Sequence, residues 1–271
     1  MDVVKANGAA IPVVGLGTWT LRGRECTELV EEAVAVGYRH FDTAQMYGNE
    51  AEVAEAVRRS GKRADIFITT KIQPENLAPR DVERTVKDSL SQMNLDHVDL
   101  LLIHWPNPRV ALADTLGAMA KLKLAGATSH IGVSNFTVAL IEEAVKVSPV
   151  PIVCNQIECH PFLDQTKVIE ACAKRGIAVV AYSPIARGNA PANALLERIG
   201  KAHGKSAAQV CLRWLTQQGI VVIPRTSNKS RLKENLDISD FALSDAEMKE
   251  IAGLSRSKKR IVDWAWSPKW D

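Results

Sequence analysis

The chain has 271 residues, of which 46% are hydrophobic and 24% charged, and this composition excludes a largely disordered protein. The formal net charge is only +3 and basic residues alternate with acidic ones, so neither a nucleic acid nor a membrane is an expected partner. Five cysteines, an odd number without CxxC spacing, predict neither a disulfide framework nor a metal site, and we expect reduced thiols in the core.

The first residues predict a hairpin and not a targeting segment. Asn7 and Gly8 form a turn signal between two apolar pairs, which indicates a hairpin over residues 3–13. No cationic segment followed by an apolar one precedes it, and no apolar run in the chain approaches the about 20 residues that a membrane helix needs. We therefore expect a cytoplasmic protein.

The remainder of the chain alternates between short apolar runs and longer amphipathic ones. The short runs predict eight strands, over residues 14–18, 38–42, 66–71, 98–104, 128–133, 152–156, 178–182 and 220–223. The longer runs predict helices over residues 27–36, 50–60, 80–92, 111–124, 137–147 and 166–174, several of them followed by a glycine. Each strand with its following helix forms one βα unit.

These units predict an α/β protein built on a (β/α)8 TIM barrel. Some strands, such as residues 100–103, are continuously apolar, which is typical of parallel strands covered on both faces. Eight units fill a chain close to the about 250 residues of such a barrel. We expect one domain over residues 1–271, with the hairpin at the barrel bottom and a short C-terminal tail. An open doubly wound sheet is the alternative.

Polar residues at the ends of three successive strands are candidates for catalysis. Asp42, Lys71 and His104 each end an apolar run, and Tyr47 follows in the loop after the second strand. A phenol has a pKa near about 10, and a neighbouring ammonium lowers that pKa. Tyr47 could therefore donate a proton to a carbonyl oxygen, with Lys71 supplying the charge, Asp42 orienting Lys71 and His104 positioning the carbonyl. The alternative is a structural ion pair beside a core histidine.

Several segments resemble the signatures of the aldo-keto reductase family, in order and over nearly the whole chain. They are Gly15-Leu16-Gly17-Thr18-Trp19, Asp42-Thr43-Ala44 with Tyr47 and Asn49-Glu50, Ile131-Gly132-Val133-Ser134-Asn135-Phe136, Asn155-Gln156 and Ala181-Tyr182-Ser183-Pro184. The short chain and compact loops are most similar to bacterial 2,5-diketo-D-gluconate reductases of the B type, which also reduce methylglyoxal. Gly15-x-Gly17 is not a dinucleotide fingerprint, because the third glycine is missing and no helix follows.

The resemblance implies an NADPH-dependent carbonyl reductase in which Tyr47 is the general acid and Asp42, Lys71 and His104 complete a catalytic tetrad. It implies that Ser134, Asn135 and Gln156 hold the nicotinamide carboxamide and that Tyr182 stacks on the nicotinamide ring. The other residues that it places against the cofactor are Gly17, Thr18, Ser183, Ile185, Arg187, Arg225, Thr226, Arg231, Glu234 and Asn235. The loop over residues 185–191 is short, so we expect no long clasp over the pyrophosphate.

The segment after the last strand predicts an anion site. Residues 223–235 read as a strand followed by the basic N-terminus of a helix, which favours phosphate, although a solvated cationic cap is the alternative. The resemblance places the adenosine 2′-phosphate there. Arg225 and Thr226 replace the usual Lys-Ser pair, and Arg231 matches an arginine that stacks on adenine.

The expected substrates are small aldehydes, α-dicarbonyls or keto-sugar acids, and we expect a monomer with no other partner. The resemblance makes Trp19 and Trp105 walls of the substrate pocket. We expect Trp270 to pack against the barrel, while Trp264 and Trp266 could cover the mouth or pack against the barrel. A Schiff-base lyase using Lys71 is disfavoured by the neighbouring Asp42. A regulatory barrel protein that binds NADPH without turnover is the alternative function.

Overall fold

The computed structural model describes residues 2–257 and 259–271. Within these residues, eight parallel strands form one sheet in which each strand pairs with the next along the chain. They are β3 (Leu16–Gly17), β4 (His40–Asp42), β5 (Phe67–Ile72), β6 (Val98–Ile103), β7 (Thr128–Ser134), β8 (Ile152–Glu158), β9 (Ala178–Tyr182) and β10 (Val221–Val222).

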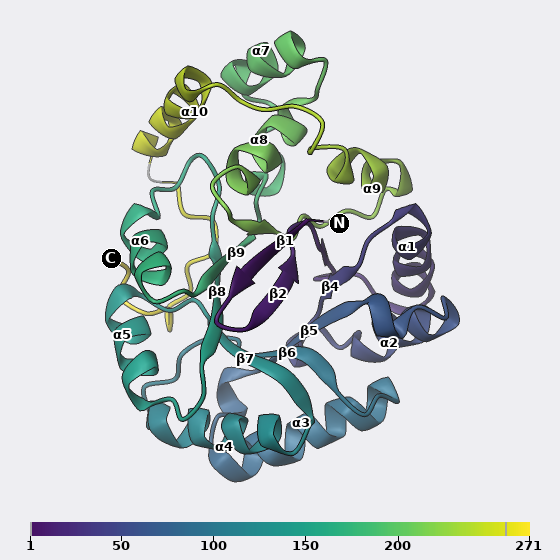
Figure 1. The fold of residues 1–271 in the computed structure, drawn as a ribbon, viewed down its shortest axis with the longest axis vertical. Helices are drawn as coiled ribbons and strands as arrows, with labels where there is room; N and C mark the ends of the chain where they lie inside the picture. The colour runs from purple at the N-terminus through teal and green to yellow at the C-terminus, as the bar shows by residue number, and fades with distance from the viewer. Residues whose placement is uncertain (1, 258) are drawn as a thin grey trace.

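The sheet closes into a barrel, as Figure 1 shows by its ring of helices around the strands. Val14 forms a parallel bridge with Val222, which joins the last strand to the first. The Gly15 N–H donates to the Val222 carbonyl at 2.9 Å, and the Val222 N–H donates to the Val13 carbonyl at 2.9 Å. The predicted barrel is confirmed, and the open sheet is wrong.

The two glycines beside this seam are needed for packing. A Cβ on Gly15 would lie 2.6 Å from the His40 ring, and a Cβ on Gly17 would lie 2.8 Å from the Ile223 carbonyl oxygen. Real side chains do not tolerate either distance. Gly15-x-Gly17 therefore allows the first and last strands to approach each other.

Helices surround the barrel, and α7 (Ala194–His203) and α10 (Asp245–Ala252) lie outside this ring (Figure 1). The helices are α1 (Gly23–Val36), α2 (Glu50–Arg59), α3 (Pro79–Met93), α4 (Leu112–Leu124), α5 (Val138–Val147), α6 (Thr166–Lys174), α7 (Ala194–His203), α8 (Ala207–Thr216), α9 (Lys229–Leu236) and α10 (Asp245–Ala252). The six predicted helices occur with ends shifted by one residue or less, except that α1 begins four residues earlier than predicted. Gly37 ends α1 as expected, since its φ of 117° suits only glycine.

The predicted hairpin consists of β1 (Val3–Ala6) and β2 (Ala9–Pro12), joined by a turn in which Asn7 and Gly8 both have positive φ. The Asn7 side chain donates to the Ile152 carbonyl at 2.8 Å, where β8 begins. The hairpin therefore covers the N-terminal ends of the strands, and Figure 1 shows it across the centre of the ring.

The strands are buried on both faces. On β6, Leu100 and Leu102 belong to the apolar cluster inside the barrel, whereas Leu101 and Ile103 belong to the cluster under the helices. This explains the continuously apolar sequence. All five cysteines are buried free thiols, as expected. In the described part of the chain, none of the helices has the length and apolarity to cross a membrane.

Candidate active site

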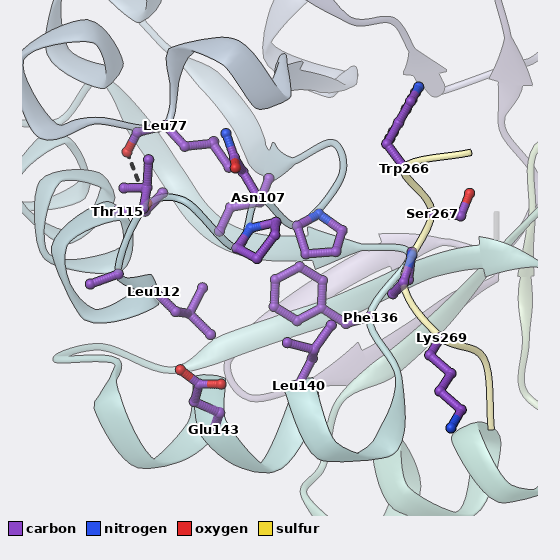
Figure 2. A pocket seen from close by; sticks show the side chains of 16 residues that line it. Leu77, Asn107, Leu112, Thr115, Phe136, Leu140, Glu143, Trp266, Ser267 and Lys269 are labelled. Carbon is purple, nitrogen blue, oxygen red and sulfur yellow. Dashed lines mark hydrogen bonds between the residues drawn. The ribbon is translucent and has the colours of Figure 1, made fainter. Parts of the chain in front are cut away.

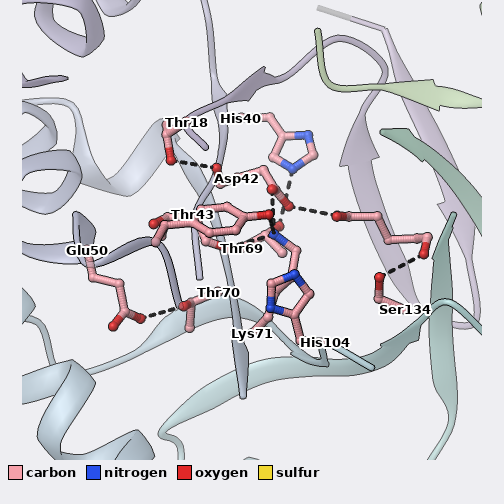
Figure 3. A network of polar contacts seen from close by, with 12 residues as sticks. Thr18, His40, Asp42, Thr43, Glu50, Thr69, Thr70, Lys71, His104 and Ser134 are labelled. Carbon is pink, nitrogen blue, oxygen red and sulfur yellow. Dashed lines mark hydrogen bonds and ion pairs between the residues drawn. The ribbon is translucent and has the colours of Figure 1, made fainter. Parts of the chain in front are cut away.

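Three adjacent strands bring Asp42, Lys71 and His104 together at the C-terminal end of the barrel. Asp42 is the last residue of β4, Lys71 lies near the end of β5, and His104 directly follows β6. Tyr47 is on the short 3₁₀ helix η1 (Gln45–Tyr47), which follows β4. Figure 3 shows the side chains of Asp42, Lys71 and His104 converging on one point, as the sequence predicts.

Lys71 is the centre of the polar network. Its Nζ donates to Asp42 Oδ1 at 2.6 Å, to the Thr43 carbonyl at 2.8 Å and to the Tyr47 hydroxyl at 3.3 Å. Both Lys71 and Asp42 are almost completely buried. Three acceptors use the three protons of the ammonium, so its direction is fixed.

The electrostatics of the network keep Lys71 charged. Burial alone lowers the pKa of Lys71, but Asp42 and Tyr47 together outweigh burial and the net pKa is raised. For Tyr47, burial raises the pKa and Lys71 offsets only part of that rise. The expected lowering by Lys71 is present, but it does not bring the net pKa of the phenol below its ordinary value.

His104 lies against Tyr47, with ring centroids 5.5 Å apart in an edge-on arrangement. Burial, followed by the charge of Lys71, holds the pKa of His104 well below its ordinary value. The imidazole is therefore neutral near pH 7. Its Nδ1 is buried and has no hydrogen-bond partner among the described residues.

The residues expected at a nicotinamide ring form a second network beside the first. Gln156 Nε2 donates to Asp42 Oδ2 at 2.7 Å, and Ser134 Oγ donates to the Gln156 carbonyl at 2.8 Å. Asn135 Nδ2 donates to the His104 carbonyl at 2.9 Å and its Oδ1 accepts from the Tyr182 hydroxyl at 2.8 Å. The ends of β7, β8 and β9 are thus hydrogen-bonded to the candidate catalytic residues.

Two other predicted cofactor residues are buried in the protein. The Thr18 side chain is fully buried and donates to the Asp42 carbonyl at 2.9 Å, which ties the end of β3 to β4. Asn235 is also buried, in helix α9. Gly17 lies in the seam between β3 and β10.

The loop after β9 carries Ser183, Ile185 and Arg187. Ser183 and Arg187 have φ values of 49° and 50°, which are unusual for residues with side chains. The Arg187 guanidinium lies 5.0 Å from the centre of the Trp19 ring. This contact brings the loop after β9 next to the loop after β3.

The basic segment lies at the N-terminus of α9, as predicted. Arg225 is exposed, and its Nε donates to the Trp19 carbonyl at 3.3 Å. Arg231 is exposed in the first turn of α9, and Thr226 Oγ1 accepts from the Asn228 N–H at 3.0 Å. Glu234 accepts a hydrogen bond from Ser206 of the neighbouring helix α8. The exposed cations can thus reach an anion beside the seam.

The tryptophans divide between the two sides of the opening. Trp19 is 45% exposed, whereas Trp105 is only 4% exposed because Trp266 and Trp270 pack edge-on against it. Trp264 stacks on Trp266, and both are about half exposed. Trp270 therefore packs against the barrel, as expected, and Trp266 presents its outer face beyond Trp105.

Sequence reasoning gave no role to Asn49 and Glu50, although both belong to the family signature. The Asn49 side chain is buried, donates to the Thr18 and Leu21 carbonyls and accepts from Thr43. The Glu50 carboxylate is buried and accepts from the hydroxyls of Thr70 and Ser89. The signal for both was polarity at the start of an amphipathic helix, which a solvent-exposed cap also explains.

A cavity of about 590 Å³ lies beside the catalytic residues and not among them. Figure 2 shows Leu77, Asn107 and Phe136 on one side and Trp266 with Ser267 on the other. The cavity separates the loop after β6 from the end of the chain.

Comparison with known proteins agrees with this geometry. The sequence model of the Aldo/keto reductase family matches residues 13–256. Methylglyoxal reductase DkgB of Yersinia pestis is 39% identical over 266 residues, covering 97% of this chain and all of that protein. Glyoxal reductase of Bacillus subtilis (strain 168) is 40% identical over 261 residues, covering 95% of this chain and 94% of that protein.

Solved structures are similar over the whole chain. A crystal structure of a protein provisionally assigned as a 2,5-diketo-D-gluconic acid reductase B is 46% identical, with a TM-score of 0.98 and coverage of 100% of this chain and 98% of that one. The aldose reductase of Schistosoma japonicum is 33% identical with a TM-score of 0.93, covering 98% and 96%. The barrel, the convergent polar residues and the match over residues 13–256 together show that this chain belongs to the aldo/keto reductase family.

Proposed function

We propose that this protein is an NADPH-dependent reductase of small aldehydes and α-dicarbonyls, with Tyr47 as the general acid. The observation that carries the proposal is the buried contact of Lys71 Nζ with both Asp42 Oδ1, at 2.6 Å, and the Tyr47 hydroxyl, at 3.3 Å. A phenol held against a charged ammonium at the mouth of a barrel is suited to give a proton to a developing alkoxide.

The side chains fit a nicotinamide cofactor. A carboxamide needs both donors and acceptors, and Asn135 and Gln156 offer side-chain amides at adjacent strand ends. Gln156 Nε2 is held by Asp42, which orients the amide. At the other end, the exposed Arg225 and Arg231 suit a 2′-phosphate at the N-terminus of α9.

When bound, NADPH supplies a hydride to the carbonyl carbon. Tyr47 donates its phenolic proton to the carbonyl oxygen as negative charge develops there, and Lys71 stabilises the resulting phenolate. Asp42 keeps Lys71 charged and fixed in direction. Neutral His104, in edge contact with Tyr47, positions the carbonyl oxygen without competing as an acid.

The substrate class is inferred from the relatives and the pocket walls. Two of the relatives are named for methylglyoxal and glyoxal reduction. The half-exposed Trp19 lies on one side of the opening and Trp266 beyond Trp105 on the other. Aromatic walls on both sides favour short carbonyl compounds.

The test is consumption of NADPH by the purified protein in the presence of methylglyoxal. We expect turnover that depends on the carbonyl compound and that is faster with NADPH than with NADH. Binding of NADPH without turnover of methylglyoxal, glyoxal or 2,5-diketo-D-gluconate would instead support a regulatory cofactor-binding protein.

A further inference from the structure

The end of the chain, residues 259–271, crosses the catalytic end of the barrel, and we call it the tail. The Lys259 N–H donates to the Phe162 carbonyl at 3.0 Å, where the tail begins. At its end, Asp271 Oδ2 accepts from the Val138 N–H at 2.9 Å, in the first turn of α5. The tail is therefore attached to the loops after β8 and β7.

The strongest attachment of the tail is a buried carboxylate that the proposed mechanism does not use. Glu158 is the last residue of β8 and is completely buried. Its two oxygens accept from the N–H groups of Ile261 and Val262, each at 2.7 Å, and Oε1 also accepts from His160 Nε2 at 2.9 Å. Among the described residues, no Lys or Arg side chain lies within ion-pair distance of Glu158, but the charge of Arg260 in the tail attracts it electrostatically.

The tail amides stabilise the buried Glu158 carboxylate, and Glu158 in turn holds the tail in place. A buried carboxylate is costly unless hydrogen bonds satisfy its oxygens. Hydrogen bonds to an ionised group are also stronger than those between neutral groups. Two adjacent backbone N–H groups that converge on one carboxylate therefore hold the start of the tail in one position.

The tail also contacts residues next to the proposed catalytic residues. Trp266 packs edge-on against Trp105 at 4.9 Å between ring centroids, and Trp105 directly follows His104. His104 contacts Tyr47. Trp266 remains 49% exposed, although Trp264 stacks on it, and it also lines the cavity beside Phe136.

We propose that Glu158 is a positioning residue that sets the substrate wall, because it holds the tail where Trp266 borders the space for the carbonyl compound. The inference rests on the proposed reductase function. Strand β8 then has two roles, because Gln156, two residues before Glu158, donates to the catalytic Asp42. One strand thus aligns the catalytic carboxylate and the wall of the pocket.

The first readout is attachment of the tail, measured by trypsin cleavage of the folded protein at the Arg260–Ile261 bond. In Glu158→Gln, an amide NH₂ replaces one acceptor oxygen and faces a backbone N–H, so at least one hydrogen bond to a charged group is lost. We expect cleavage to be about 10- to 100-fold faster. Glu142→Gln, which changes an exposed carboxylate that pairs with Arg175, is the matched control and should leave the rate unchanged.

The second readout is the effect on substrate binding, measured by steady-state kinetics with methylglyoxal and NADPH. Glu158→Gln should raise KM for methylglyoxal several-fold while kcat and the Kd for NADPH stay within about twofold. Trp266→Ala should raise KM in the same way without faster cleavage at Arg260. Val262→Pro removes the N–H that donates to Glu158 and changes no residue of the barrel. If Glu158→Gln does not fold, Val262→Pro should still show faster cleavage and a raised KM.

Unchanged cleavage in both Glu158→Gln and Val262→Pro would overturn the anchoring role. Faster cleavage with an unchanged KM for methylglyoxal would show that the tail does not form a wall of the substrate pocket. An equal loss of affinity for NADPH would also contradict this role, because it would mean that Glu158 supports the cofactor site. If the parent protein turns over no carbonyl compound, the proposed function fails, and the cleavage rates alone decide whether Glu158 anchors the tail.

Discussion

At the scale of single residues, the catalytic end depends on a lysine that is buried and charged at the same time. Lys71 satisfies this demand through Asp42, the Thr43 carbonyl and Tyr47. The sequence predicts the contact with Asp42, because Asp42 and Lys71 end adjacent strands, and strand ends meet in a parallel barrel. It does not predict the Thr43 carbonyl as a partner. The burial of Tyr47 is not predictable in this way, since it depends on how η1 folds back over Lys71.

Tyr47→Phe should abolish carbonyl reduction and leave the Kd for NADPH nearly unchanged, because the phenolic proton acts only in the transition state. Steady-state turnover of methylglyoxal and a fluorescence titration with NADPH measure the two quantities. Activity within a few fold of the parent would remove Tyr47 from the role of acid.

Lys71→Met should also be inactive and should destabilise the fold by about 3–5 kcal/mol, because Asp42 is then a buried charge without its partner. The double variant Asp42→Asn/Lys71→Met should recover much of the free energy of unfolding but none of the activity. Denaturant titrations measure the stabilities. Equal stability of the single and double variants would show that Asp42 does not depend on Lys71.

The pH profile follows from the direction of two pKa shifts. Tyr47 acts in its protonated form, so activity is lost as the pH rises through its pKa, which burial raises above about 10. His104 acts in its neutral form, and its lowered pKa moves any acidic loss well below about 6.5. We expect kcat/KM for methylglyoxal to be flat between these limits. A decline centred near pH 8 would mean that Lys71 outweighs burial.

At the scale of elements, the N-terminus of α9 and the loop after β3 form the site that we propose for the far end of the cofactor. The sequence predicts this helix from its basic start after the last strand. It does not predict that Arg225 donates to the Trp19 carbonyl, because that contact depends on barrel closure. Helices α7 and α8 are absent from the predicted set, although α8 begins with a capping box formed by Ser206 and Gln209.

Arg225→Gly should weaken NADPH binding by about tenfold to a hundredfold and barely change NADH binding, because a charged hydrogen bond to the 2′-phosphate is worth about 1.5–3 kcal/mol. Dissociation constants for both cofactors, measured on the same preparation, provide the comparison. Lys233→Gly, in the last turn of α9, is a control on the same helix. Equal losses for NADPH and NADH would show that Arg225 supports the fold.

At the scale of the whole molecule, the repeat of βα units together with the chain length favoured the barrel over an open sheet, and the Asn7-Gly8 turn predicted the hairpin. Periodicity and spacing report on local burial, and eight such units have few ways to pack. The walls of the pocket were less predictable. Trp105 is buried by Trp266 and Trp270, more than 150 residues away in the sequence, and no local pattern signals such a contact.

Trp19→Ala should enlarge the opening on the side away from the tail, so kcat/KM for a bulky aldehyde should rise relative to that for methylglyoxal. The ratio of the two specificity constants in the parent and the variant is the measurement. If both constants fall together and their ratio is unchanged, Trp19 supports packing and does not border the substrate.

The narrow seam of the barrel has a consequence for its local motions. β3 and β10 have only two residues each, and few backbone hydrogen bonds cross between them, whereas β5 and β6 share four registered pairs. Hydrogen exchange should therefore be faster at the Gly15, Gly17 and Val222 amides than at the amides of β5 and β6. Gly17 and Arg225 lie on opposite sides of this seam, so added NADPH should slow exchange there more than elsewhere in the barrel.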